Sequence, residues 1–427
     1  MRMKFNNSRQ LLLVSAASLL AAVLITACGT ATVDFVYVTS SKAAGPNSYG
    51  EIDVFEINGV SGYMRQIPAS PFPSGGRNPV AEAVSSDNTM LYVVNQDDNT
   101  IVQFLIGDDG KIYPQNTVNT PGIYPLAVAV SGTSMFVVDT YEPLPACSNA
   151  DPCPGSVGVF PLLPATTGAN PTPAGAPGTP LTNTAIGADY WPLILPSNPA
   201  HIITPTAINV LKSGADLFVT AYDSSVTPNV GYVFGFSIGS GGVLTPLNGG
   251  VPHDMGVGAN GLGIRPTAIA SDSTSTYVYV TDSTNGTVVS YSFASGVLTK
   301  ISDTPTGNQP SAIVVDSLYP YAYVANSTDG NVEAYSISSS GALTYLGGSS
   351  TPVTYAAGID PVAMGIDPST HHFVFTANFN PSGLNGSVSN FELSSTTGTL
   401  VNAQNSPYTS NATPTAVASV PHGSTQE

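Results

Sequence analysis

Charged residues are scarce in this sequence, and positive charge is the scarcest. Only 9% of the 427 residues are charged, and only ten are Lys or Arg. Three of these cations, Arg2, Lys4 and Arg9, lie near the N-terminus, which leaves seven cations against 27 acidic residues in the rest of the chain. Such a negative surface repels phosphate backbones. We therefore expect no nucleic acid among the partners of this protein.

An apolar run from Leu11 to Ala27 follows the first cations. It is shorter than the ~20 residues of a membrane-spanning helix and ends in small residues, so residues 1–27 are predicted to be a signal peptide. The run closes as LITAC, which resembles a bacterial lipobox. This resemblance implies cleavage before Cys28, a lipid on its sulfur and, because Gly29 follows, a place in the outer membrane. An ordinary signal peptide with an incidental cysteine is the alternative.

Cysteine is almost as rare as positive charge, with three in the chain. Besides Cys28 there are Cys147 and Cys153, six residues apart in the Pro-rich stretch TYEPLPACSNADPCPGS. An oxidising compartment and this short spacing predict a local disulfide. A zinc site would need further ligands, which the surrounding sequence lacks. We predict no metal and no cofactor.

Helical periodicity is missing from the best-defined stretch, residues 310–346. Its apolar runs AIVV, YAYVAN, NVEAYSI and ALTYL are rich in β-branched and aromatic residues, and clusters of Ser, Asp, Gly and Asn separate them. No segment between the runs is long enough to form a helix. The stretch therefore predicts a small four-stranded sheet.

The same unit recurs along the chain. A Pro-x-Ala triplet opens an apolar strand at Pro79, Pro125, Pro205, Pro266, Pro310, Pro361 and Pro414. Each of the first six is followed by a second strand, such as LYVVN, VYVTD or AYVAN, and by a third in which Ile or Val precedes an aromatic by three residues. A lone four-stranded sheet leaves both faces uncovered and needs neighbours, so these repeats predict propeller blades.

The two ends of the chain complement each other. FVYVTS at 35–40 is a second strand without a first, whereas Pro414 opens a first strand shortly before the sequence stops. We expect the termini to share one blade, which closes the ring and removes its open edges. The predicted fold is all-β, a propeller of seven four-stranded antiparallel blades over residues 35–420. Residues 28–34 would be a lipidated tether and residues 421–427 a tail.

LYVVN, VYVTD and AYVAN, with their Pro-x-Ala and aromatic strands, resemble the YVTN-repeat and 6-phosphogluconolactonase-like seven-bladed propellers. The resemblance covers roughly residues 35 to 420 and implies the fold. It also implies a relation to sugar-lactone hydrolases, although many members carry no established reaction. No lactonase active-site motif can be placed on this sequence, so no catalytic residue is predicted.

Loop lengths distinguish the two faces of the predicted ring. In each blade, the loop between strands two and three emerges on the same face as the link to the next blade. The long loops fall on this side, including the stretch around Cys147 and the link 163–204, in which the fourth strand of the third blade cannot be placed. We call it the long-loop face and predict that it binds a ligand or partner, because rigid scaffolds present function on loops. Neutral variation in loop length is the alternative.

Two arginines stand just upstream of Pro-x-Ala strands, Arg77 in the second blade and Arg265 in the fifth. Both should reach the funnel from the long-loop face, nearly opposite each other, where guanidinium groups suit a carboxylate. Asp360, before the seventh blade, could instead neutralise one of them, and each arginine could also be ion-paired or point outward. With Tyr124, these are the predicted ligand-binding residues.

The remaining polar motifs favour structural roles. His371 and His372 belong to a short hairpin on the opposite face and are predicted to form a surface turn. The residues that end the second strands are predicted to cap turns, although a polar ring around a cation or water is the alternative; they are Asn95, Asp139, Asp282, Asn326 and Asn378.

The predicted protein is a monomeric, lipid-anchored, extracytoplasmic propeller. Its predicted function is to bind a small molecule or a protein through the long-loop face, without catalysis. The alternative is a lactonase-like hydrolase of a sugar lactone, which needs a base or metal beside a concave polar site. An acid and a histidine brought together at the funnel would favour the enzyme.

Overall fold

The computed structural model describes residues 32–42, 48–167, 172–348, 350–382 and 385–423. The predicted signal peptide and Cys28 lie outside these ranges. In the described part of the chain, no helix is long and apolar enough to cross a membrane.

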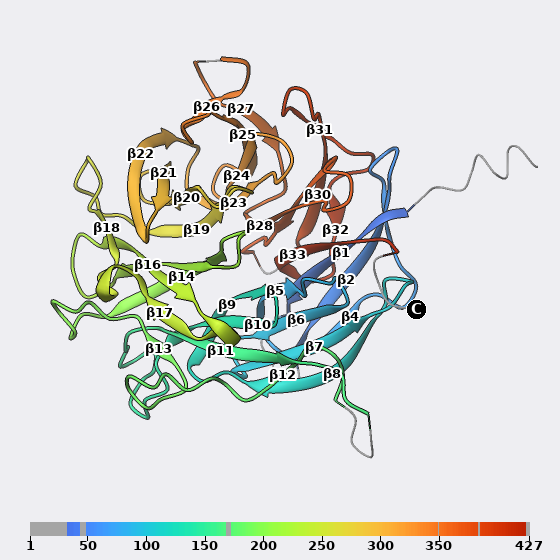
Figure 1. The fold of residues 1–427 in the computed structure, drawn as a ribbon. Coiled ribbons are helices and arrows are strands. Elements are labelled where there is room, and N and C mark those ends of the chain that lie inside the picture. Colours follow the sequence, from blue (N-terminus) through green and yellow to red (C-terminus); the bar gives the residue numbers. More distant parts are fainter. Residues whose placement is uncertain (1–31, 43–47, 168–171, 349, 383–384, 424–427) are drawn as a thin grey trace, which may run out of the picture.

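The described residues form seven antiparallel sheets, which we number as blades from the one that contains both chain ends (Figure 1). Blade 1 contains, from the inside outward, β33 (Thr413–Pro421), β1 (Thr32–Ser41), β2 (Tyr49–Asn58) and β3 (Met64–Gln66), with β4 (Phe72–Arg77) also paired to β2. Blade 2 contains β5 (Pro79–Val84), β6 (Met90–Asn95), β7 (Thr100–Ile106) and β8 (Ile112–Asn119). Blade 3 contains β9 (Ile123–Ser131), β10 (Ser134–Tyr141), β11 (Ser156–Leu163) and the short β12 (Ala176–Pro177) and β13 (Trp191–Pro192).

The other blades repeat this order, and short 3₁₀ turns η1 (Ser240–Gly242), η2 (Leu247–Gly250) and η3 (Leu346–Gly348) interrupt their outer edges. Blade 4 contains β14 (Ile203–Val210), β15 (Asp216–Asp223), β16 (Val230–Ile238), β17 (Leu244–Pro246) and β18 (His253–Gly256). Blade 5 contains β19 (Pro266–Ser271), β20 (Tyr277–Asp282), β21 (Thr287–Ala294) and β22 (Val297–Pro305). Blade 6 contains β23 (Pro310–Val315), β24 (Tyr321–Asn326), β25 (Asn331–Ile337), β26 (Leu343–Tyr345) and β27 (Val353–Ala356). Blade 7 contains β28 (Pro361–Ile366), β29 (Phe373–Asn378), β30 (Ser387–Leu393), β31 (Leu400–Asn402) and β32 (Tyr408–Thr409).

The inner strands make a closed ring, in which each contacts the inner strand of the next blade. The predicted closure is confirmed, because β33 from the C-terminal end pairs antiparallel with β1 from the N-terminal end. Thr415 Oγ1 donates a hydrogen bond of 2.8 Å to the carbonyl oxygen of Pro79, which ties blade 1 to blade 2. Blades 5 and 6 make the same bridge to their next blade through Thr267 and Ser311. The seven-bladed fold predicted from the repeats is therefore confirmed.

The core lies between the blades. Successive side chains of a strand point to opposite faces of its sheet, so the second strand of each blade packs against both neighbouring blades. In β1, Tyr37 packs with Leu91 of blade 2, whereas Val38 packs with Phe375 of blade 7. These second strands are apolar on both faces because both faces are buried.

The polar residues that end the second strands have a structural role. Asp139 is buried, and its Oδ2 accepts the backbone N–H of Gly122 at 3.0 Å, just before β9. A Cβ added to Gly122 would lie 2.4 Å from that of Asp139, so only glycine fits there. Gly76 makes the same close approach to Asn95 in blade 2, although the side-chain amide of Asn95 has no hydrogen-bond partner among the described residues. Asp139 therefore holds the link between blades against the end of the second strand, as a turn cap would, whereas Asn95 only packs against its link.

The fourth strand of blade 3 is split into two short pieces. β12 pairs with the end of β11, at Leu162 and Leu163, whereas β13 pairs with its beginning, at Ser156 and Val157. Each piece contains a proline, which cannot donate to a sheet and confines the pairing to an edge. The sequence did not show this strand because neither piece is long enough to have a period.

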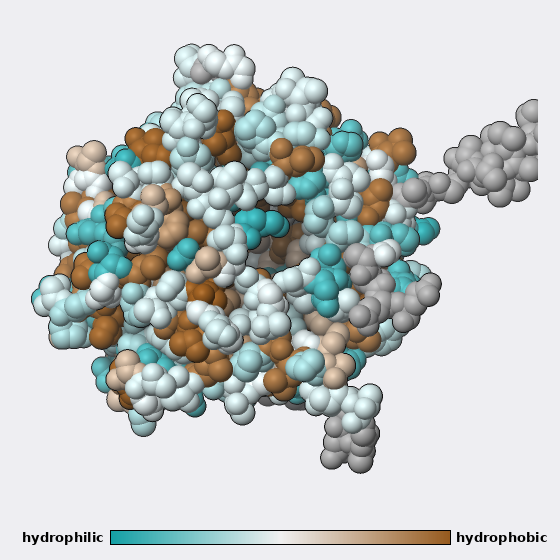
Figure 2. Space-filling model, in the orientation of Figure 1, coloured by the Kyte–Doolittle hydropathy of each residue, from teal (hydrophilic) through white to brown (hydrophobic). Residues whose placement is uncertain are grey.

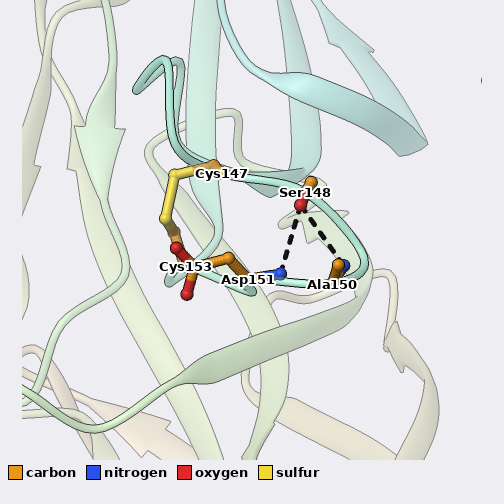
Figure 3. The surroundings of a disulfide bond; sticks show 5 residues. All are labelled: Cys147, Ser148, Ala150, Asp151 and Cys153. Atoms are coloured by element: carbon orange, nitrogen blue, oxygen red, sulfur yellow. Dashed lines mark hydrogen bonds between the residues drawn. A yellow bond between two sulfur atoms is a disulfide. The ribbon is translucent and has the colours of Figure 1, made fainter.

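The predicted disulfide is present between Cys147 and Cys153, whose Cα atoms are 5.4 Å apart (Figure 3). Inside its loop, the backbone N–H groups of Ala150 and Asp151 donate to Ser148 Oγ. Tyr141 at the end of β10 donates its hydroxyl to Asn149 Oδ1 at 3.0 Å. The loop is therefore held by the disulfide and hydrogen bonds within it, and by a hydrogen bond to the blade that carries it.

Candidate functional site on the long-loop face

The mouth of the ring on the long-loop face is formed by the first residues of the inner strands and by the residues that precede them. Four of them adopt a left-handed backbone directly before a proline, with φ of 50° to 54°: Asn78, Tyr124, Gln309 and Asp360. This conformation is uncommon outside glycine, and its recurrence in four blades shows that it is a feature of the links between blades. Figure 2 shows the hollow at the centre of one face, where the inner strands surround the axis.

The two predicted arginines occupy different environments. Arg77, at the end of β4 in blade 1, forms an ion pair with Asp98 between β6 and β7 of blade 2, and its Nε lies 2.7 Å from Asp98 Oδ1. The guanidinium of Arg265 instead lies over the ring of Tyr222 in blade 4, 5.0 Å from its centroid. Arg77 is therefore engaged, whereas Arg265 is held by an aromatic ring that leaves its hydrogen-bond donors available.

Arg265 is unusual among the cations of this chain. In the described ranges, five of the seven Lys and Arg side chains form ion pairs; they are Lys42, Arg65, Arg77, Lys111 and Lys300. The other two are Arg265 and Lys212, and Lys212 lies in the β14–β15 hairpin on the opposite face. Arg265 is thus the one described cation at the mouth that has no ion-pair partner, and it can meet an anionic ligand.

Tyr124 lines the same mouth in blade 3. Its backbone N–H donates to Asn99 Oδ1 at 2.7 Å, and its carbonyl accepts from Thr140 Oγ1 at 2.7 Å. Its ring packs edge-on against Tyr141, with centroids 6.1 Å apart. Burial raises the pKa of Tyr141, and the phenols of Tyr124 and Tyr222 add to this effect. The tyrosines therefore form an aromatic side of the mouth that extends toward Arg265.

Asp360 lines a cleft of about 620 Å³ between blades 6 and 7. Gln309, Ser327 and Asp329 lie in the same cleft. Asp329 accepts two hydrogen bonds from Asn308, from its backbone N–H at 2.7 Å and from its side-chain amide at 2.8 Å. Burial raises the pKa of Asp360, and a hydrogen bond with Ser327 opposes the rise. The carboxyl, amide and hydroxyl groups that line this cleft suit the hydroxyls of a sugar-like ligand.

An acid and a histidine that sequence reasoning did not bring together meet on this face. His201 Nδ1 lies 2.5 Å from Asp223 Oδ2 at the end of β15. Asp223 is buried, and its other oxygen accepts the backbone N–H of Ser225 at 2.9 Å, whereas the His201 side chain is 34% exposed. Ile203 of β14 pairs with Asp223 of β15, and His201 lies two residues before Ile203. Aligning the start of the first strand with the end of the second would have placed the two residues side by side.

Glu82 is another polar residue near the axis that the sequence did not single out. It is the only Asp, Glu, Lys, Arg or His on the seven inner strands, all of which lie in the described ranges, and the corresponding residues of the other blades are Val, Ile or Met. Its Oε2 accepts from Thr39 Oγ1 of blade 1 at 2.5 Å. Burial raises the pKa of Glu82 to about 8. Glu82 therefore joins blades 1 and 2 near the axis.

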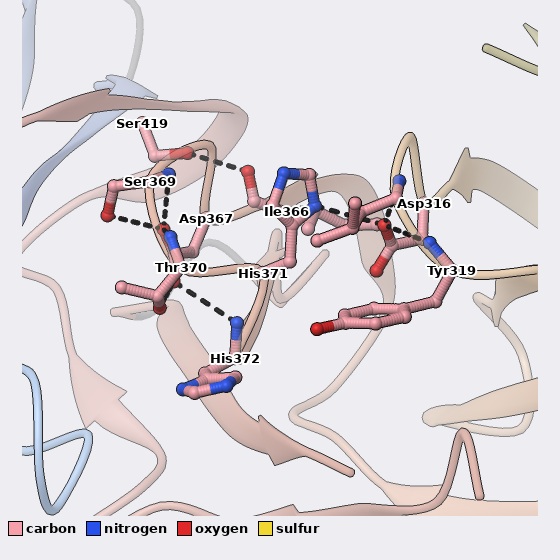
Figure 4. Close-up of polar contacts among 10 residues, drawn as sticks. Asp316, Tyr319, Ile366, Asp367, Ser369, Thr370, His371, His372 and Ser419 are labelled. Atoms are coloured by element: carbon pink, nitrogen blue, oxygen red, sulfur yellow. Dashed lines mark hydrogen bonds and ion pairs between the residues drawn. The ribbon is translucent and has the colours of Figure 1, made fainter. Parts of the chain in front are cut away.

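The histidines of the opposite face have structural contacts (Figure 4). His371 lies in the β28–β29 hairpin, as predicted, and its Nδ1 lies 3.0 Å from Asp316 Oδ1 in the neighbouring blade. Asp316 also accepts the backbone N–H groups of Leu318 and Tyr319. His372 points away from this pair and donates its backbone N–H to Asp367. In the described part of the chain, no group of three His, Cys, Asp or Glu residues is arranged to hold a metal ion.

Comparison with known proteins agrees with this architecture. Residues 276–423 match the family model described as Lactonase, 7-bladed beta-propeller. This match and the seven-bladed ring confirm the predicted resemblance to the lactonase-type propellers. No curated protein matches the chain.

Solved structures are similar in fold over nearly the whole chain. The periplasmic gluconolactonase of Pseudomonas aeruginosa has a TM-score of 0.64 and 17% identity, covering 91% of this chain and 99% of its own. A candidate 6-phosphogluconolactonase from Bacteroides fragilis has a TM-score of 0.63 and 17% identity, covering 92% and 99%. A Lactobacillus plantarum protein has a TM-score of 0.65 and 16% identity, covering 91% and 99%. At such identities these likenesses concern the fold alone.

Proposed function

We propose that this propeller binds a small sugar acid or its lactone at the long-loop mouth and hydrolyses the lactone. The observation that carries the proposal is the contact between His201 and Asp223, because a carboxylate that holds one ring nitrogen orients the imidazole for proton transfer through the other. The resemblance to lactonase-type propellers supports the same reaction class.

In the proposed reaction, Asp223 accepts the Nδ1–H of His201, which leaves Nε2 without a proton. Nε2 takes a proton from water as the water oxygen forms a bond with the lactone carbonyl carbon. The ring carbon–oxygen bond then breaks, and the imidazolium returns its proton to the departing ring oxygen. The product is a hydroxy acid, whose carboxyl proton goes to solvent.

Arg265 supplies the anion contact in this proposal. It belongs to the blade next to that of His201, and its guanidinium matches a carboxylate, a phosphate or the oxyanion formed at the carbonyl. The polar cleft beside Asp360 is where the sugar hydroxyls would bind. Arg77 is assigned no role in binding, because its guanidinium is already paired with Asp98.

Binding without turnover is the second candidate function, and the availability of Arg265 favours it equally. The two candidates differ in what His201 does. A ligand held by Arg265 and the cleft needs no base, whereas hydrolysis does. The rate of hydrolysis therefore separates them.

The direct test is lactone hydrolysis followed by pH-stat titration, with glucono-δ-lactone and 6-phosphogluconolactone as substrates and spontaneous opening subtracted. His201→Gln should lower kcat/KM by about 10² or more, because it removes the general base. His372→Gln, on the opposite face, is the matched control and should not change the rate. A wild-type rate equal to that of His201→Gln would overturn the hydrolase.

Binding is measured separately with gluconate or 6-phosphogluconate by calorimetry. Arg265→Ala should weaken binding by about tenfold, close to 1.4 kcal/mol. Arg77→Ala is the control and should leave the affinity unchanged. Equal affinity in the wild type and in Arg265→Ala would remove the anion site for both candidate functions.

We also propose that a lipid on Cys28 anchors the protein outside the cytoplasm, in the outer membrane. Cys28 lies outside the described residues, and the proposal rests on the LITAC sequence. Labelling with radioactive palmitate should mark the wild type and not Cys28→Ala, which should be released or left unprocessed. An acylated, membrane-bound Cys28→Ala protein would contradict the anchor.

A further inference from the structure

A second cavity, of about 450 Å³, lies on the outer strands at the seam between blades 3 and 4. One wall comes from residues 183–196 of the long link after β11. The other wall comes from β16, β17 and η2 of blade 4. None of the residues predicted at the mouth lines this cavity. It is therefore a separate feature of the molecule.

The walls of this cavity are well supported. Trp191 is buried, and its Nε1–H donates a hydrogen bond of 2.9 Å to the carbonyl oxygen of Leu244 across the seam. Below it lies the apolar core shared by blades 3 and 4, which includes Phe234 and Phe236. Prolines stand in both walls and restrict the backbone; they are Pro192, Pro196, Pro246 and Pro252. A cavity with such supports is preorganised, which lowers the entropy lost when a ligand binds.

The chemistry of the lining is apolar. No Asp, Glu, Lys, Arg or His is among its residues. Ile186, Val243 and Val251 at its edge are 49%, 45% and 53% exposed. A charged ligand would lose its hydration here without gaining a partner. An apolar ligand would instead cover these side chains and remove their surface from water.

We propose that this cavity is a binding site for a small, uncharged, largely apolar molecule with an aromatic or aliphatic body. Its volume falls in the range of small-molecule pockets, which are mostly apolar with a few polar groups. Asn183, Thr184 and Thr245 are the polar residues of the lining and provide such groups. The site is independent of the proposed lactone chemistry, since it shares no residue with the mouth.

The chain contains its own reporter for this proposal. Trp191 is the only tryptophan in the sequence, so the tryptophan fluorescence of the whole protein comes from the wall of this cavity. The probe is N-phenyl-1-naphthylamine, which is uncharged and accepts energy from tryptophan. Titration should quench Trp191 and enhance the probe in one saturable step.

Variants at the exposed edge test the location without disturbing the core. Val243→Glu and Ile186→Glu, on opposite walls, should each weaken probe binding at least tenfold because they bring a charge to the edge. Val401→Glu is the matched control, at a valine that is 64% exposed in blade 7, and should bind like the wild type. Thermal melting of all three should match that of the parent.

Two results would overturn the proposal. One is the absence of saturable quenching in the folded wild type. The other is equal probe affinity in the wild type and in both edge variants, which would place the probe elsewhere. Neither result depends on whether the mouth hydrolyses a lactone, so the two proposals fail or stand separately.

Discussion

The two faces of the propeller use polar residues differently. On the opposite face, acids in the short hairpins are surrounded by donors from their own turns. Asp272 accepts the backbone N–H groups of Thr274, Thr276 and Tyr277, and Asp367 accepts those of Ser369, Thr370 and His372. On the long-loop face, Arg265 has an aromatic ring as its partner. Each face has one histidine held by a carboxylate, but the His201 side chain is 34% exposed, whereas that of His371 on the opposite face is 15% exposed.

This difference distinguishes polar groups that stabilise the fold from polar groups that are free to bind a ligand. A carboxylate that accepts several N–H groups from its own hairpin has no capacity left for a ligand, and its removal strands those donors. A side chain that uses only some of its polar atoms within the protein can still form hydrogen bonds to a ligand with the others. We therefore expect the opposite face to determine stability and the long-loop face to determine binding.

Removing β33 should have the largest effect, because both faces depend on the closed ring. A chain that ends at Thr413 loses the inner strand of blade 1, which exposes the edge of β1 and removes the contacts of β33 with the inner strands β5 and β28. We expect aggregation or the loss of cooperative unfolding, measured by calorimetry. Deletion of residues 424–427 alone is the control. A truncated protein that melts like the parent would disprove the closure.

Asp367→Ala sharpens the comparison between the faces. It leaves three backbone N–H groups without their acceptor, and it should lower the free energy of unfolding by about 3 kcal/mol. Arg265→Ala, on the long-loop face, should change it by less than about 0.5 kcal/mol. Urea denaturation measures both. Similar losses in the two variants would remove the distinction.

Asp34 makes the opposite face sensitive to pH. Burial, with the adjacent Asp367 carboxylate, raises the pKa of Asp34 from 3.8 to about 9. The folded state therefore holds a proton that the unfolded state releases above about pH 4. Its contribution to stability is complete below that pH and is lost as the pH rises toward 9.

The prediction for Asp34 concerns the slope of stability against pH. Between pH 6 and 9, the melting temperature of the wild type should fall more steeply than that of Asp34→Asn, in which no proton is lost. Glu82 keeps its raised pKa in both proteins, so the difference isolates Asp34. Asp189→Asn is the control and should follow the wild type. Parallel curves for the wild type and Asp34→Asn would show that Asp34 is not protonated in the folded state.

The disulfide should have a local effect, confined to the long-loop face. Replacing Cys147 and Cys153 with Ser removes a closure that contributes about 2 kcal/mol for so short a loop. Hydrogen exchange should accelerate between residues 142 and 154 and remain unchanged in the hairpins of the opposite face. Faster exchange throughout blade 3 would show that the disulfide supports the whole blade.

Most of the fold could be predicted because it is repeated. The Pro-x-Ala triplets and the strands such as AYVAN recur in blade after blade. Each copy alone predicts a strand only weakly, but the repetition makes the prediction of a blade reliable. The exception is informative. The outer strand of blade 3 has two residues in β12 and two in β13, and pairing that short is determined by the neighbouring strand rather than by its own residues.

The sequence alone determined the number of blades, their closure through the termini and the pairing of Cys147 with Cys153. Those features depend on local patterns and on short separations along the chain. Only the tertiary structure decided which arginine is available, that His201 meets Asp223 and that Trp191 lines a cavity. Those features depend on which side chains of different strands and blades come into contact, and the register that brings them together is set by packing across the whole ring.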